Sequence, residues 1–148
     1  MQALTQHTEQ SAIFVPFLGM MLLTFLVWLY MYIRRLRFLI GHGINPQDVS
    51  TPEKAVHVIP ERVNNASNNL KNLFELPVLF YAVCLYLYIR TQVDSWHLAC
   101  AWGFLFLRAI HSAIQCTINL VLPRFLAYAL ASLALWTMVI RSAWRLIS

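Results

Sequence analysis

Four long apolar segments, separated by short polar stretches, dominate the pattern of the sequence. The first covers residues 12–33, a run of 22 residues without a charged side chain. The others cover about residues 62–89, 96–122 and 124–146. A bilayer core of about 30 Å is crossed by about 20 apolar residues in a helix, so each segment is long enough to span it. The pattern predicts an all-α integral membrane four-helix bundle, with one four-span domain over residues 1–148.

The ends of these segments carry recognisable signals. Arg34, Arg35 and Arg37 follow the first segment, and no Lys or Arg precedes it, so we expect a retained helix rather than a cleaved signal peptide. Residues 34–61 form the one long loop, in which Ser50 or Thr51 before Pro52 could start a short helix. Further along the chain, we expect the third helix to begin after an N-cap at Asp94 or Ser95 and to end at Pro123.

Composition and charge support a membrane protein and give its expected orientation. Hydrophobic residues make up 59% of the chain and charged residues 11%, whereas a soluble domain carries about 25% charged residues. Seven Lys and Arg side chains lie in or beside the long loop and the turn between the third and fourth segments. Three lie at the opposite ends of the segments, on the other side of the membrane. The positive-inside rule therefore places the loop in the cytoplasm and both termini outside. The net charge of +5 indicates contact with membrane lipid rather than with nucleic acid.

Two polar stripes interrupt the apolar segments. Helical spacing puts the polar residues of each segment on one face: Glu61, Asn65, Asn68, Asn72 and Glu75 in the second, and Arg108, His111, Gln115 and Asn119 in the third. At 1.5 Å per residue, Glu75 and Arg108 lie at similar depths, about 21 and 18 Å from the same end of the bundle. We therefore predict that the stripes face each other through a Glu75–Arg108 salt bridge. Such a pair could simply hold the helices together, or it could line a ligand cavity.

The remaining reactive side chains give weaker evidence for a functional site. Arg124 and Tyr128 stand one turn apart at the start of the fourth segment, where they could be membrane-interface anchors or part of a site. The three cysteines form no C-x-x-C motif and are expected to pack as small apolar side chains. No spacing of His and Cys predicts a metal site, and we expect none.

Several of these motifs together resemble the MAPEG superfamily, the membrane-associated proteins of eicosanoid and glutathione metabolism. The resemblance covers nearly the whole chain and includes motifs similar to those of microsomal prostaglandin E synthase and microsomal glutathione transferase. It rests on the order and spacing of Arg35, Asn45-Pro46-Gln47-Asp48, Lys71-Asn72-x-x-Glu75 before Pro77, Arg108-x-x-His111, and Arg124 with Tyr128. The asparagines at 64, 65, 68, 69 and 72 are more similar to the bacterial branch, which implies a multi-pass protein of the bacterial inner membrane.

The resemblance implies a fold, a cofactor and a set of site residues. Members are four-helix subunits in homotrimers that bind glutathione between subunits near the cytoplasmic side. Arg124 would stabilise the glutathione thiolate, and Tyr128 would hydrogen-bond the thiol or the leaving group. By the same resemblance, the residues that bind glutathione would be Arg35, Asn68, Lys71, Asn72, Glu75, Arg108 and His111.

Two function classes follow from this resemblance and from the positions at which the sequence differs from the family pattern. The first is a membrane-bound glutathione-dependent transferase or peroxidase that acts on a lipophilic electrophile. The second is a non-catalytic lipid-binding protein or an accessory subunit of a membrane complex. Arg124 and Tyr128 favour the enzyme. Asn68, Lys71 and Gln115, which replace two arginines and a tyrosine of the eicosanoid enzymes, favour the second class.

Overall fold

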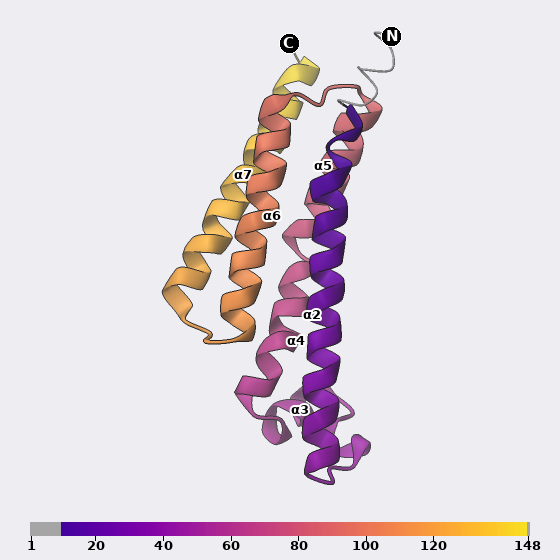
Figure 1. Cartoon of the computed structure of the whole chain (residues 1–148), viewed down its shortest axis with the longest axis vertical. Helices are drawn as coiled ribbons and strands as arrows, with labels where there is room; N and C mark the ends of the chain where they lie inside the picture. The colour runs from indigo at the N-terminus through magenta and orange to yellow at the C-terminus, as the bar shows by residue number, and fades with distance from the viewer. Residues whose placement is uncertain (1–9, 148) are drawn as a thin grey trace.

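The computed structural model describes residues 10–147, and within that range the regular elements are all helical. Four long helical stretches run along the molecule, and a short helical loop joins the first to the second (Figure 1). The elements are α2 (Phe14–Gly41), the 3-10 turn η1 (Pro46–Val49), α3 (Pro52–Val58), α4 (Glu61–Leu73), α5 (Leu76–Ile89), α6 (Ser95–Cys116) and α7 (Val121–Ile147).

The helices are arranged as two antiparallel pairs. One pair is α2 with α4 and α5, and the other is the hairpin of α6 and α7 (Figure 1). The start of α2 and the end of α7 lie at one end of the bundle, called here the terminal end. The opposite end, which carries η1 and α3, is called the loop end; the α6–α7 hairpin stops short of it (Figure 1). The turn before α7 is therefore level with the middle of α4 rather than with α3.

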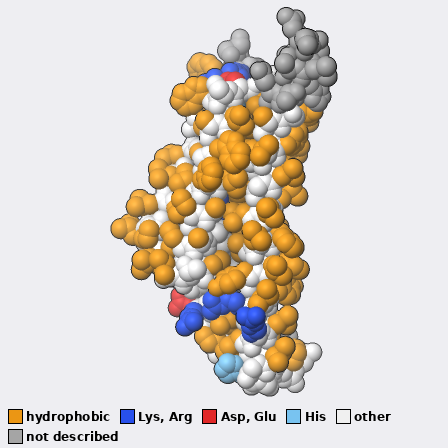
Figure 2. All heavy atoms as spheres, in the orientation of Figure 1, with side chains coloured by type: hydrophobic (Ala, Val, Ile, Leu, Met, Phe, Trp, Pro, Cys, Tyr) orange, Lys and Arg blue, Asp and Glu red, His pale blue; other side chains and the backbone are white. Residues whose placement is uncertain are grey.

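The outer surface of the bundle is apolar over most of its length. Four helical stretches are long and apolar enough to cross a membrane, and only 17–33% of the residues in their most apolar windows are buried. Many of the other side chains are exposed, including Leu18, Leu22, Phe106 and Leu133. The face of the molecule drawn in Figure 2 is largely hydrophobic. Such a surface suits lipid rather than water, and the protein is an integral, multi-pass membrane protein.

The core lies along the line where the two helix pairs meet. Phe80 of α5 stacks on Phe104 of α6, with ring centroids 4.6 Å apart, and both side chains are fully buried. At Gly19 of α2, an added Cβ would lie 2.7 Å from Leu105 Cδ2. The missing side chain at this position therefore lets α2 approach α6 closely.

Two of the predicted helix ends are confirmed in atomic detail. Asp94 caps α6, since its Oδ1 accepts a hydrogen bond from the backbone N–H of His97 at 2.9 Å. Thr51 caps α3, and its Oγ1 accepts from the Lys54 N–H at 3.4 Å. Both side chains satisfy a helix-terminal N–H group that would otherwise lack a partner.

The first two helices differ from their predicted ranges. The first continues beyond the arginines to Gly41, so its last turns carry Arg34 and Arg35. The second was predicted as one helix but is interrupted between α4 and α5, where Glu75 has φ −97° and ψ −102°. Pro77 explains the interruption, because its ring lacks an N–H and would clash with the carbonyl of Leu73 in a continuous helix.

The turn between the last two helices also differs from its prediction. Pro123 was expected to end the third helix, but α6 already ends at Cys116 and α7 begins at Val121. Asn119 closes the turn with φ +49°, and its N–H donates to the Ile114 carbonyl at 2.7 Å. Asparagine tolerates this left-handed conformation better than most residues, and Pro123 fits the first turn of a helix, where its missing N–H costs little.

Candidate functional site

Buried polar side chains of α6 and half-buried polar side chains of α4 and α7 form one cluster on the loop-end side of the bundle. On α6, Arg108, His111 and Gln115 are spaced three and four residues apart and are 0%, 3% and 5% exposed. This spacing places them on one helix face, as the sequence predicted. They point between α4 and α7, away from the exposed apolar side chains of the same helix.

Arg108 is the largest fully buried side chain of the described residues and has no acidic partner in a salt bridge. Its Nη2 donates to the Asn72 backbone carbonyl at 2.7 Å, and its guanidinium carbon lies 5.3 Å from the centroid of the Tyr128 ring. Its Nε and Nη1 are buried without a hydrogen-bond partner. A buried cation with unsatisfied donors is costly, and in a membrane segment such a residue marks a candidate functional site.

The predicted Glu75–Arg108 salt bridge is not formed. Glu75 is exposed at the break between α4 and α5, and no ion pair joins it to Arg108 in the described part of the chain. The prediction assumed an unbroken second helix. The interruption ahead of Pro77 removes Glu75 from the inward face of α4 and leaves a backbone carbonyl as the acceptor.

A chain of hydrogen bonds joins three helices around His111. His111 Nδ1 lies 2.9 Å from the Arg124 carbonyl of α7, and its Nε2 lies 2.9 Å from Gln115 Oε1. Gln115 Oε1 also accepts from Asn72 Nδ2 of α4, at 3.1 Å. The prediction that the two polar stripes face each other is therefore confirmed at Asn72 and Gln115. Both ring nitrogens of His111 are engaged, which fixes its orientation.

Arg124 lies in the first turn of α7 and points back to the turn before it. Its Nη1 donates to Asn119 Oδ1, and Asn119 Nδ2 donates to Asn65 Oδ1 of α4 at 3.3 Å. The helix begins three residues before Arg124, and the Arg124 N–H already donates to the Leu120 carbonyl, so this N–H is not free to bind a ligand.

A second buried network, which the sequence analysis did not single out, lies beside the first. Asn69 is fully buried; its Nδ2 donates to Cys116 Sγ at 3.4 Å, and its Oδ1 accepts from Ser112 Oγ at 3.3 Å. The inward face of α4 is therefore formed by Asn65, Asn69 and Asn72. The predicted stripe had Asn68 in place of Asn69. The signal that could have revealed this face is the matching four-residue spacing of Asn65 and Asn69 with Ser112 and Cys116.

Three other predicted site residues lie around a separate cavity at the loop end. Arg35 of α2 and Asn68 and Lys71 of α4 line a cavity of about 280 Å³, together with residues of the segment that leads into α3. Figure 2 shows Lys and Arg side chains gathered toward this end of the molecule. The predicted residues thus form two groups within the chain, an inner cluster and this basic cavity, with Glu75 exposed outside the inner cluster.

The inner cluster comprises five of the nine predicted site residues: Asn72, Arg108, His111, Arg124 and Tyr128. Tyr128 joins it through ring contacts, with its centroid 5.6 Å from that of His111. Within the described residues, no three His, Cys, Asp or Glu side chains are grouped so that they could hold a metal ion. The guanidinium groups of Arg108 and Arg124 form no salt bridge with any described residue, which makes the cluster suited to an anion.

These features define a class: a helical membrane protein with a buried, basic polar cluster that joins its second, third and fourth membrane helices. The model of the MAPEG family matches residues 6–144, and the chain belongs to this family. The resemblance that the sequence motifs suggested is therefore confirmed at the family level. No curated protein and no solved structure matches the chain significantly. Membership suggests a function of the glutathione-transferase or eicosanoid type in general.

Proposed function

We propose that the protein is a membrane-bound glutathione-dependent transferase or peroxidase that acts on a lipophilic electrophile. The observation that carries this proposal is the pair Arg108 and Arg124, two guanidinium groups without a carboxylate partner, beside Tyr128 and His111. Buried donors without partners, Arg108 Nε and Nη1, fit a ligand that brings negative charge. Glutathione does so through two carboxylates and, when ionised, its thiol.

The roles of the side chains follow from their places in the cluster. Arg124 would stabilise the thiolate, since a thiol of pKa near 8.5 ionises more readily beside a cation. Tyr128 would donate a hydrogen bond to the thiol or the leaving group, and His111 holds the start of α7 in place through the Arg124 carbonyl. The chemistry that glutathione supplies is a thiol nucleophile, which forms a sulfur–carbon bond as a leaving group departs with its bonding electrons. The apolar outer surface gives a lipophilic substrate access from the membrane.

The basic cavity at the loop end would complete the binding site. Arg35, Asn68 and Lys71 line this cavity, and Arg35 and Lys71 could hold a carboxylate of the peptide. Lys71 offers a point charge where an arginine would offer a planar fork, so its contact is less directional. In a homotrimer, the cavity of one subunit and the inner cluster of its neighbour could face the same bound molecule.

Calorimetric titration of the purified protein in detergent with glutathione tests this proposal. We expect saturable binding, and weaker binding of ophthalmic acid, in which a methyl group replaces the thiol. Loss of a charge-assisted hydrogen bond to the thiolate is worth about 1.5–3 kcal/mol, or roughly ten- to a hundredfold in affinity. If neither peptide binds, glutathione is not the ligand and the enzyme proposal fails.

The assembly is a further prediction of the same proposal. The loop-end half of α4 exposes Glu61, Arg62, Asn68 and Lys71, a face too polar for lipid, which we expect to lie against other subunits. Native mass spectrometry in a mild detergent should show a homotrimer. A stable monomer that still binds glutathione would contradict the shared site, while leaving the ligand itself established.

One observation favours the second class, a non-catalytic lipid-binding or accessory subunit. Gln115, which stands where the eicosanoid enzymes have a tyrosine, already bridges His111 and Asn72. Its amide therefore satisfies polar groups within the protein that a ligand would otherwise contact. A protein of this class would show neither glutathione binding nor turnover.

A further inference from the structure

A second hollow lies at the terminal end, on the side of the molecule formed by α6 and α7. It is a groove of about 600 Å³ whose walls are largely apolar. Trp96 and Cys100 of α6 and Thr137, Ile140 and Trp144 of α7 line it. Arg141 and Arg145 also line it, one turn apart on α7. The groove thus combines an apolar interior with two cations near the end of the bundle.

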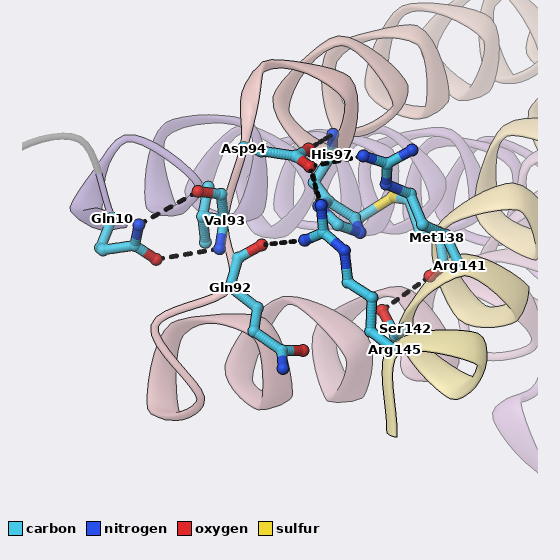
Figure 3. Close-up of polar contacts among 9 residues, drawn as sticks. All are labelled: Gln10, Gln92, Val93, Asp94, His97, Met138, Arg141, Ser142 and Arg145. Carbon is cyan, nitrogen blue, oxygen red and sulfur yellow. Dashed lines mark hydrogen bonds and ion pairs between the residues drawn. The ribbon is translucent and has the colours of Figure 1, made fainter. Parts of the chain in front are cut away.

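The two arginines share a single carboxylate. Arg141 Nη2 and Arg145 Nη2 both contact Asp94 Oδ2, at 2.8 and 2.6 Å (Figure 3). Asp94 Oδ1 is already engaged, because it accepts the His97 backbone N–H at 2.9 Å. Partial burial alone would raise the pKa of the Asp94 carboxyl, but the His97 N–H and the two guanidinium groups outweigh it and hold the pKa well below its usual range. The carboxylate is therefore ionised at neutral pH, and the group as a whole keeps one positive charge in excess.

Several polar atoms of this group have no hydrogen-bond partner among residues 10–147. Arg141 Nε is buried without a hydrogen-bond partner. His97, which is 1% exposed and lines the groove, has no partner at Nε2; its Nδ1 lies 2.8 Å from Asp94 Oδ1 without hydrogen-bond geometry. Figure 3 shows the Asp94 carboxylate, the His97 ring and both guanidinium groups meeting at one place. The groove therefore has apolar walls and, at one end, positive charge and nitrogen atoms without hydrogen-bond partners. These features suit an anion that is joined to a long apolar chain.

We propose that this groove binds one anionic phospholipid per subunit, with its phosphate at Arg141 and Arg145 and an acyl chain along Thr137 and Ile140. Arginine pairs with phosphate through two parallel hydrogen bonds, and basic groups between membrane helices are known to hold lipid head groups. Trp96 and Trp144 are 63% and 73% exposed beside the groove, as suits side chains at a membrane–water boundary. A soluble anion would leave the apolar walls unused, so the combination favours a lipid. The site lies at the opposite end of the bundle from the loop-end cavity and does not depend on the proposed enzyme activity.

Native mass spectrometry with added lipid tests this site directly. The protein in neutral detergent is titrated with phosphatidylglycerol and with phosphatidylcholine of identical acyl chains. We expect one phosphatidylglycerol per subunit, bound about tenfold more tightly than phosphatidylcholine, because charge-assisted hydrogen bonds are the stronger class. The double variant Arg141→Gln/Arg145→Gln should lose this preference. The matched control Arg37→Gln/Lys54→Gln, which removes two exposed cations from the loop side, should keep it.

Two further variants separate the head-group contact from the acyl contact. Asp94→Asn keeps a helix-capping side chain but frees both guanidinium groups, so binding of phosphatidylglycerol should tighten. Thr137→Phe narrows the groove and should weaken both lipids alike. If the double variant does not fold, Arg145→Gln alone should reduce the preference. The proposal is wrong if the wild type shows no preference, if the control loses it, or if a fatty acid of equal chain length displaces phosphatidylglycerol at equal concentration.

Discussion

We expect replacement of Arg124 by alanine to lower thiol-conjugation turnover more than a hundredfold, while glutathione affinity falls much less. The reason is that glutathione binds as the neutral thiol but reacts as the thiolate, so a cation at this position stabilises the reacting form more than the bound thiol. A stabilisation of about 3 kcal/mol in the transition state corresponds to such a rate loss. Arg124→Lys should restore only part of the activity, because an ammonium group lacks the planar fork. The measurement is conjugation to a generic aryl halide and reduction of a lipid hydroperoxide, each compared with the wild type.

The contact between Arg124 and Asn119 provides the matched control for this experiment. Asn119→Gly removes the acceptor of the Arg124 hydrogen bond but keeps the cation, and glycine accepts the φ of +49° at this position. If Arg124 serves only to hold the turn before α7, both variants should lose activity equally. If the guanidinium acts on the thiolate, Asn119→Gly should remain within a few-fold of the wild type. Should the wild type turn over neither substrate and bind no glutathione, the accessory-subunit proposal would replace the enzyme.

The sequence predicted Arg108, His111 and Gln115 on the inward face of α6 correctly, but it also placed there Asn119, which lies in the turn after the helix. The inward face of α4 was predicted only in part. On α6, polar residues three and four apart stand among apolar ones, so only one helix face fits them. On α4, asparagines at 64, 65, 68, 69 and 72 satisfy two overlapping faces equally well. Packing against Ser112 and Cys116 selects the face with Asn69, and Asn68 is left for the loop-end cavity. Periodicity cannot choose between two faces of the same polarity.

Two other features depend on geometry that helical spacing does not contain. The depth calculation for Glu75 and Arg108 was sound for straight helices, but it took no account of the interruption before Pro77. The group at the terminal end joins Asp94 to side chains 47 and 51 residues away in the chain. Arg141 and Arg145 are four residues apart and share a face of the fourth segment, but spacing within one helix does not show which residue of another segment they will contact.

Arg108→Met should leave the protein at least as stable as the wild type while abolishing its activity. A buried guanidinium without a carboxylate partner carries a desolvation penalty of several kcal/mol that its one hydrogen bond, to the Asn72 carbonyl, offsets only in part. Methionine has a similar length and fills irregular space in an apolar core, so the loss of that hydrogen bond, about 1–3 kcal/mol, is balanced by relief of the penalty.

The measurement combines thermal unfolding in detergent with glutathione titration and turnover. Arg37→Met, at an exposed position of α2, serves as the control and should change none of these quantities. A sharp fall in the unfolding temperature of Arg108→Met would show that the guanidinium holds the helices together. An unchanged temperature with lost glutathione binding would show instead that the chain keeps this buried charge for its ligand.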